Sequence, residues 1–131
     1  MLEMGKRIRV MITDDHAVVR QTLVSFLEGQ PEMEIVGEAS DGAQAVAMAR
    51  RLLPDVVVMD INMPVMDGVE ATKIICSEQS GTCVIGLSMW NDEHHRTVML
   101  DAGAGILVSK DSGMLEILAA IRDHGVSKTK I

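Results

Sequence analysis

The chain alternates short apolar runs with longer stretches in which apolar residues recur at helical spacing. The short runs are rich in Val, Ile and Met and predict buried β-strands at 8–13, 34–38, 56–59, 84–87 and 105–109. The longer stretches predict a helix through Val19 and Leu27, then helices at 41–53, 67–78, 91–102 and 112–124, the last one ending at Gly125. Strands that alternate with helices favour parallel pairing through helical crossovers. We therefore predict an α/β fold, a doubly wound five-stranded parallel sheet with five helices.

Polar side chains that could bind a ligand or react follow four of the predicted strands. Asp14 and Asp15 come after the first strand, Asp60 after the third, Ser88 after the fourth and Lys110 after the fifth. Ligands of a doubly wound sheet bind outside the carboxyl ends of its strands, near the point where the winding direction reverses. The joint placement of these residues therefore predicts a site at that edge of the sheet.

The types of residue at this edge indicate phosphoryl chemistry with a metal ion. Asp14, Asp15 and Asp60 would repel one another, and oxygen ligands of this kind suit a hard cation such as Mg²⁺. A carboxylate can attack phosphorus to give an acyl phosphate, which makes Asp60 a candidate nucleophile. Lys110 would neutralise the transferred group, and the Ser88 hydroxyl would donate a hydrogen bond to it.

Each of these residues also has an ordinary interpretation when it is taken alone. An aspartate at a strand end is usually a turn or capping residue, and Asp14 or Asp15 could cap the following helix. We interpret His16 as an ordinary polar residue beside the acidic pocket, and the adjacent His94 and His95 as part of a solvated helix start, since neighbours on a helix do not share a face. Only the combination of residues carries the functional interpretation.

Composition limits the possible partners. The chain has 131 residues, about one domain, and a net charge of −7, which argues against binding of a nucleic-acid backbone by this segment. Aromatic residues make up 2%, so base or flavin stacking is disfavoured. No apolar stretch approaches the length of a membrane helix, so we expect no membrane partner and a cytoplasmic protein with Cys76 and Cys83 as thiols.

The whole set resembles the receiver domain of a two-component response regulator, over roughly 8–124. The resemblance implies a flavodoxin-like strand order 2-1-3-4-5. It implies the following roles: Asp60 as phosphoacceptor, Asp15 as a direct Mg²⁺ ligand, Asp14 as a ligand mainly through water, the backbone carbonyl of Asn62 as the third protein oxygen, Ser88 as the switch hydroxyl and Lys110 as the phosphate-binding lysine. The motif that carries Asp60 continues through Met63-Pro64 to Asp67-Gly68.

Details of the sequence point to one branch of that family. The opening Asp14-Asp15-His16, Arg20, the stretch 101–104 and Lys110-Asp111 resemble the LuxR/NarL/FixJ branch, whose receivers precede a helix-turn-helix domain. Leu107 stands where many relatives have Tyr or Phe, so part of the usual switch is not expected. Asp111 replaces a common proline, so no cis peptide is expected there. Trp90, two residues after Ser88, is expected in an exposed loop that borders the phosphorylation site in the family.

The resemblance implies a phosphorylation-driven switch rather than an enzyme with an external substrate. We interpret 1–7 as a leader, 8–125 as the receiver domain and 126–131 as the start of a linker to a missing carboxyl-terminal helix-turn-helix domain. The implied partners are a sensor histidine kinase, a second copy on phosphorylation, and DNA only through that missing domain. Three alternatives stay open. They are a stand-alone signalling receiver, a phosphate-blind interaction module and a Mg²⁺-dependent aspartyl phosphatase, whose second aspartate would be Asn62 here.

Overall fold

The computed structural model describes residues 7–89 and 92–129 of the chain. Within them the strands are β1 (Ile8–Thr13), β2 (Met33–Ala39), β3 (Val56–Asp60), β4 (Cys83–Ser88) and β5 (Ile106–Ser109). The helices are α1 (Ala17–Glu28), α2 (Gly42–Leu52), α3 (Gly68–Glu78), α4 (Glu93–Ala102), a 3₁₀ turn η1 (Lys110–Ser112) and α5 (Met114–Thr129). Trp90, for which the sequence predicted an exposed loop, lies outside the described residues.

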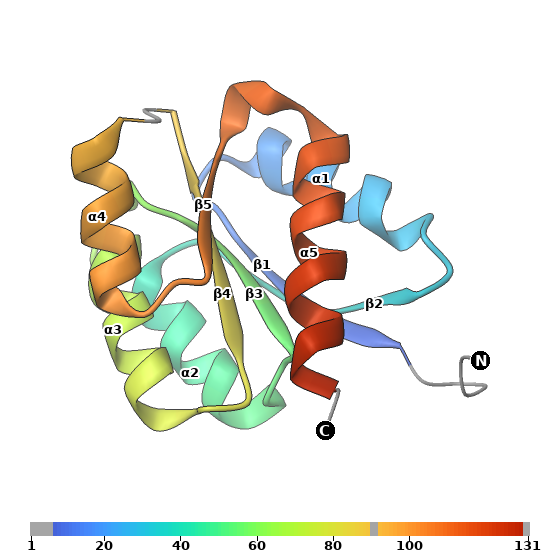
Figure 1. The fold of residues 1–131 in the computed structure, drawn as a ribbon, viewed down its shortest axis with the longest axis horizontal. Helices are drawn as coiled ribbons and strands as arrows, with labels where there is room; N and C mark the ends of the chain where they lie inside the picture. Colours follow the sequence, from blue (N-terminus) through green and yellow to red (C-terminus); the bar gives the residue numbers. More distant parts are fainter. Residues whose placement is uncertain (1–6, 90–91, 130–131) are drawn as a thin grey trace.

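The strands form one parallel sheet in the order β2-β1-β3-β4-β5. Helices α1 and α5 cover one face, and α2, α3 and α4 cover the other (Figure 1). This arrangement confirms the predicted doubly wound fold and strand order. The winding direction reverses between β1 and β3, because α1 leaves β1 toward one face whereas α3 leaves β3 toward the other.

Two apolar cores explain why the central strand β3 is an almost continuous apolar run. Successive side chains of a strand point to opposite faces, so Val56 and Val58 join the core under α1 and α5 while Val57 and Met59 join the core under α2, α3 and α4. All five residues of β3 are buried. A strand covered on both faces has no solvated side, which accounts for the continuous apolar run.

Aspartate caps begin three of the helices. Asp41 Oδ1 accepts from the backbone N–H of Gln44, and Asp67 and Asp92 cap α3 and α4 in the same way. Each cap satisfies an N–H group that the helix leaves unpaired. His16 occupies the capping position of α1 but makes no side-chain capping bond, so neither Asp14 nor Asp15 is the cap residue there.

The predicted end of α5 at Gly125 is wrong. The helix continues through Gly125 to Thr129, so residues 126–129, predicted to begin a linker, are helical. Gly125 serves packing instead, because a Cβ atom at this position would lie 2.8 Å from Cγ2 of Ile8 at the start of β1. The helix also begins later than predicted, at Met114, because η1 and Gly113, with φ +94°, intervene after β5.

Further expectations concern cysteines and membranes. Cys83 is buried and Cys76 half-buried, and no disulfide joins them. Among the described residues, no helix combines the length and apolar character that a membrane crossing needs. No cis peptide occurs in the described residues, and Leu107 is buried in the core below α4.

Candidate functional site

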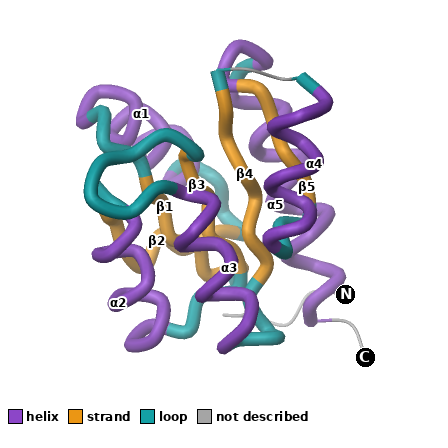
Figure 2. The backbone as a smooth tube through the Cα atoms, turned by 90° about the vertical axis from the view of Figure 1, so that its left-hand side faces the viewer, coloured by secondary structure: helices purple, strands orange, loops and turns teal. Residues whose placement is uncertain are grey.

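The loops after β1, β3 and β5 meet at one edge of the sheet, at the top of the views in Figures 1 and 2. Asp14 follows β1 directly, Asp60 is the last residue of β3, and Lys110 begins η1 after β5. The neighbouring strands β1 and β3 are those between which the winding reverses. The structure therefore brings three of the predicted residues to the place where doubly wound folds bind ligands.

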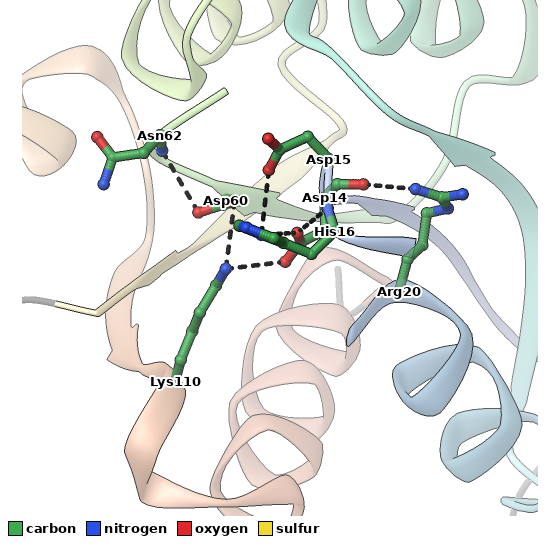
Figure 3. Close-up of polar contacts among 7 residues, drawn as sticks. All are labelled: Asp14, Asp15, His16, Arg20, Asp60, Asn62 and Lys110. Atoms are coloured by element: carbon green, nitrogen blue, oxygen red, sulfur yellow. Dashed lines mark hydrogen bonds and ion pairs between the residues drawn. The ribbon is translucent and has the colours of Figure 1, made fainter. Parts of the chain in front are cut away.

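Lys110 faces two buried carboxylates. Its Nζ atom lies 3.0 Å from Oδ2 of Asp14 and 3.3 Å from Oδ2 of Asp60 (Figure 3). The side chains of Asp14 and Asp60 are 0% and 3% exposed, and that of Lys110 is 12% exposed. Because water is largely excluded, the attraction between the ammonium and the carboxylates is stronger here than on a surface. The two carboxylates therefore share one cation.

Backbone groups fix the remaining oxygens of the two carboxylates. Asp14 Oδ1 accepts from the N–H of His16 at 2.9 Å, and Asp60 Oδ1 accepts from the N–H of Asn62 at 3.3 Å. The side-chain amide of Asn62 points away from the carboxylates in Figure 3. The backbone N–H of Asn62, and not its side chain, is therefore the group that contacts Asp60.

Burial and charge shift the protonation of this group. Burial in the protein and then the neighbouring charge of Asp14 raise the pKa of Asp60 to about 6, although Lys110 opposes the shift. For Lys110, burial alone would lower the pKa, but contact with Asp14 and Asp60 outweighs it and the pKa is raised. Lys110 is therefore a stable cation at neutral pH, whereas Asp60 carries a carboxylate that its surroundings stabilise poorly.

The loop between β3 and α3 closes tightly beneath Asp60. The N–H of Gly68 donates to the carbonyl of Ile61 at 2.7 Å, and a Cβ atom on Gly68 would lie 2.1 Å from the carbonyl oxygen of Asp60. Only glycine permits this approach. Val65, within the same loop, has φ +70°, which is rare for a β-branched residue. The motif from Asp60 to Gly68 thus forms a compact turn that fixes the direction of the Asp60 side chain.

Arg20 supports the acidic loop in a way that sequence reasoning missed. Its Nη1 donates to the backbone carbonyl of Asp14 at 2.7 Å, and its Nε donates to Glu38 of β2 at 3.2 Å. The guanidinium thereby ties α1 to the residue that follows β1 (Figure 3). The sequence interpretation used Arg20 only as a mark of one branch. Its position one helical turn after His16 was the signal that could have placed its side chain near the loop after β1.

The donor atoms at this edge fit a divalent cation. Oδ2 of Asp14, Oδ1 of Asp15 and Oδ2 of Asp60 are buried and accept no aligned hydrogen bond. Their contacts are ion pairs with Lys110 and His16, so each oxygen can still offer a lone pair to an ion. One ligand atom from each of Asp14, Asp15, Asp60 and His16 can be chosen so that all lie within 4.8 Å of one another. Carboxylate oxygens are the ligands that Mg²⁺ prefers. The three carboxylates, hereafter the acidic cluster, therefore fit Mg²⁺.

Ser88 lies at the same edge as the acidic cluster. It is the last residue of β4, fully buried, and pairs with Ser109 of β5, while its neighbour Leu87 pairs with Asp60. The hydroxyl therefore belongs to the strand adjacent to Asp60. Of the histidines, His95 contacts Asp92 through Nδ1 at 2.7 Å on α4, as a helix-start residue. His16 instead approaches Asp14 and Asp15.

Comparisons with known proteins show strong similarity. The family model for the response regulator receiver domain matches residues 10–122. The chain is 44% identical to the transcriptional regulatory protein LiaR of Bacillus subtilis, over 95% of this chain and 59% of LiaR. It is 40% identical to a protein-glutamate methylesterase/protein-glutamine glutaminase of Caldanaerobacter subterraneus, over 98% of this chain and 35% of that protein. The signal receiver domain of NarL from Mycobacterium tuberculosis superposes with a TM-score of 0.88 at 33% identity, over 92% of this chain and 98% of that one.

The chain spans 59% of the length of LiaR and 35% of that of the methylesterase. It spans nearly all of the NarL receiver domain. The similarity is therefore to one domain, which occurs in longer proteins whose names describe different activities.

Proposed function

The chain belongs to the response regulator receiver domain family, in the branch of LiaR and NarL, and on this premise we propose that Asp60 accepts a phosphoryl group from a sensor histidine kinase and that the domain then changes conformation. Receiver domains are phosphoacceptor switches, and the proposal assigns that chemistry to particular atoms of this chain. The observation that carries it is the buried Asp60 carboxylate, which faces Lys110 at the carboxyl edge of the sheet.

In the proposed reaction, an oxygen of Asp60 forms a bond to phosphorus. The bond between phosphorus and the histidine nitrogen of the donor breaks, and its electron pair leaves on that nitrogen. The carboxylate must be ionised to attack, and the Asp60 pKa of about 6 leaves it mostly ionised at neutral pH. Its poor stabilisation in the resting site favours the reaction, since bond formation moves negative charge from the carboxylate onto the phosphoryl oxygens.

Two further side chains are proposed to hold the transferred group. Lys110 places a full positive charge 3.3 Å from Asp60, where it can pair with a phosphoryl oxygen. The Ser88 hydroxyl, on the adjacent strand β4, is proposed to donate to another of these oxygens. In this proposal the Ser88 contact links the phosphoryl group to β4 and therefore to α4, which follows it.

Receiver domains bind Mg²⁺ at a cluster of aspartates, and the acidic cluster here fits that ion. We assign Asp15 and Asp60 as direct side-chain ligands, Asp14 as a ligand mainly through water, and the backbone carbonyl of Asn62 as the third protein oxygen. Bound Mg²⁺ would neutralise these carboxylates and accept oxygens of the phosphoryl donor. Asp14 is suited to the outer position because its carboxylate already contacts Lys110 and the N–H of His16.

The test is incorporation of an acid-labile phosphoryl group from acetyl phosphate, followed by intact-protein mass spectrometry. We expect one phosphoryl group on the wild-type chain with Mg²⁺, none on Asp60→Asn and none when the ion is chelated. Asp67→Asn is the matched control, because Asp67 is exposed, lies in the same loop and only caps α3, a task that Asn performs equally well. Labelling of Asp60→Asn at the wild-type level would overturn the proposal.

We propose that the output is transcription. LiaR, which is named a transcriptional regulatory protein, extends beyond the part that this chain matches. By this analogy the chain would act from the cytoplasm through a further helix-turn-helix domain, which would make the only DNA contact, and phosphorylation would favour a homodimer. Reading the gene past Ile131 tests this. Without a DNA-binding domain there, a stand-alone signalling receiver becomes the better interpretation.

A further inference from the structure

A nitrogen atom lies among the oxygens of the acidic cluster. Nδ1 of His16 is 3.3 Å from Oδ1 of Asp14 and 3.3 Å from Oδ1 of Asp15. Figure 3 shows the imidazole turned inward between these two carboxylates. Ligands side by side on a six-coordinate ion lie about 3 Å apart when each is about 2.1 Å from the metal. The separation between Nδ1 of His16 and Oδ1 of Asp15 therefore matches that of neighbouring ligands of one ion.

The local fold does not require this placement of the ring. His16 occupies the capping position of α1 but makes no side-chain capping bond, and its side chain is 65% exposed. The ring forms a hydrogen bond with Oδ1 of Asp14 at 3.3 Å. The ring thus lies against two carboxylates of a site whose buried oxygens accept no aligned hydrogen bond.

Lys110 does not compete for the same side of Asp14. The lysine contacts Oδ2, whereas the imidazole contacts Oδ1 of the same carboxylate. Asp14 thus lies between a permanent cation and a group that can be either an ion partner or a metal ligand. The side of the acidic cluster that bears His16 and Asp15 is the side open to an ion from solvent, since Asp15 is 27% exposed while Asp14 is fully buried.

We propose that His16 is a metal ligand through Nδ1, and that the acidic cluster together with His16 takes a divalent transition-metal ion such as Mn²⁺ in preference to Mg²⁺. Imidazole nitrogen suits first-row transition metals, whereas Mg²⁺ favours oxygen ligands and keeps its waters. The carboxylates supply the negative charge that either ion needs, and the His16 nitrogen supplies the preference for Mn²⁺ over Mg²⁺. This inference rests on the proposed function, because it concerns the ion of the same site.

The other described histidines do not offer such a position. His95 pairs through Nδ1 with the single carboxylate of Asp92 at the start of α4. Among residues 7–89 and 92–129, the one group of three or more potential ligands is that of Asp14, Asp15, His16 and Asp60. His95→Ala is therefore a matched control, since it removes a half-buried imidazole beside an aspartate without touching the acidic cluster.

The experiment measures Mn²⁺ binding by electron paramagnetic resonance, with Mg²⁺ affinity obtained by competition, on the whole chain. The variants are His16→Ala, His16→Asn and His95→Ala. Asn places an oxygen close to the position of Nδ1 and can also cap α1. Pulsed measurements on bound Mn²⁺ detect a directly bonded nitrogen, and this readout does not depend on phosphorylation.

For wild type and His95→Ala we expect a nitrogen signal from bound Mn²⁺. In His16→Ala the signal should vanish and Mn²⁺ affinity should fall about tenfold or more, since even outer contacts of a metal site are worth that much. The Mg²⁺ affinity should change less than about threefold, because that ion favours oxygen. His16→Asn should recover part of the Mn²⁺ affinity without the nitrogen signal.

The outcomes separate this inference from the proposed function. Mn²⁺ bound to wild type without a nitrogen signal, or an equal loss of both ions in His16→Ala, would overturn the ligand role and leave His16 as an ion partner of the carboxylates. Failure of both ions to bind the wild-type chain would instead overturn the proposed function and the inference together.

Discussion

Lys110 and Asp14 form an ion pair between the two strand ends that are furthest apart within the site. Asp14 follows β1 and Lys110 follows β5, and the strands β3 and β4 lie between them in the sheet. The Nζ to Oδ2 distance is 3.0 Å, shorter than the 3.3 Å from Nζ to Asp60. In the resting domain Lys110 therefore pairs with both carboxylates. A phosphoryl group on Asp60 would change how the ammonium is shared between Asp14 and Asp60.

Replacing Lys110 by Met should destabilise the fold in a pH-dependent way. The variant leaves two buried carboxylates facing each other without their cation, and breaking a buried pair in this manner costs about 3 kcal/mol or more. The loss of unfolding free energy should be largest at pH 7.5 and smaller at pH 5.0, where Asp60, with a pKa of about 6, is mostly protonated. Urea unfolding in the presence of a chelator measures both. Lys73→Met, on an exposed position of α3, should change stability by less than about 0.5 kcal/mol.

Asp60→Asn should stabilise the metal-free domain at neutral pH. The folded state raises the pKa of Asp60 from 3.8 to about 6, so it binds more protons than the unfolded chain between these values. Stability contributed by the protonated carboxyl is present below about pH 4 and is lost as pH rises through 6. Each pKa unit corresponds to about 1.4 kcal/mol, which sets an upper estimate of about 3 kcal/mol at pH 7.5.

The measurement is the difference in unfolding free energy between Asp60→Asn and wild type from pH 4 to 8 with a chelator present. It should be near zero at pH 4 and rise to a plateau above pH 7. Added Mg²⁺ should reduce this difference in unfolding free energy, because an ion that binds the folded wild-type site stabilises the wild-type protein. If the difference in unfolding free energy does not change across this pH range, the folded state does not raise the pKa of Asp60.

Gly125→Ala should lower stability although it lies within a helix. Alanine in a helix interior is favoured over glycine by about 1 kcal/mol, which alone would predict stabilisation. Here the new Cβ would lie 2.8 Å from Ile8 Cγ2, and overpacking of a core typically costs about 1–3 kcal/mol. Thermal and urea unfolding give the net sign. Gly81→Ala, where nothing lies within 4 Å, is the control and should be neutral or slightly stabilising.

The same glycine shows where sequence reasoning stops. A glycine after a helical pattern favours a helix end, and the contact of Gly125 with Ile8 joins residues at opposite ends of the chain, which no local pattern reveals. The central strands were predictable because a strand that is buried on both faces needs apolar residues at successive positions, as in β3. Apart from the end of α5, strand and helix ends differ from the prediction by one or two residues, where short-range signals compete.

The site, too, was predictable in part. That Asp14, Asp60 and Lys110 share an edge followed from the rule that parallel strands carry their ligands at their carboxyl ends. Which atoms meet did not follow, because the contacts of His16 with Asp15 and of Arg20 with the Asp14 carbonyl depend on how α1 leaves the sheet. An exposed histidine next to two aspartates reads as an ordinary polar residue until the direction of its ring is known.

Val65→Asn should stabilise the domain. Val65 has φ +70° and is 85% exposed, so the valine bears the strain of a left-handed backbone and gains almost nothing from burial. Asparagine tolerates this conformation, and relief of the strain should raise the unfolding free energy by about 1 kcal/mol. Val18→Asn is the matched control. Val18 is 79% exposed in α1, where asparagine has no such advantage and should be neutral or slightly destabilising. Urea unfolding of the two variants side by side decides the matter, and equal shifts would show that the loop beneath Asp60 carries no strain at Val65.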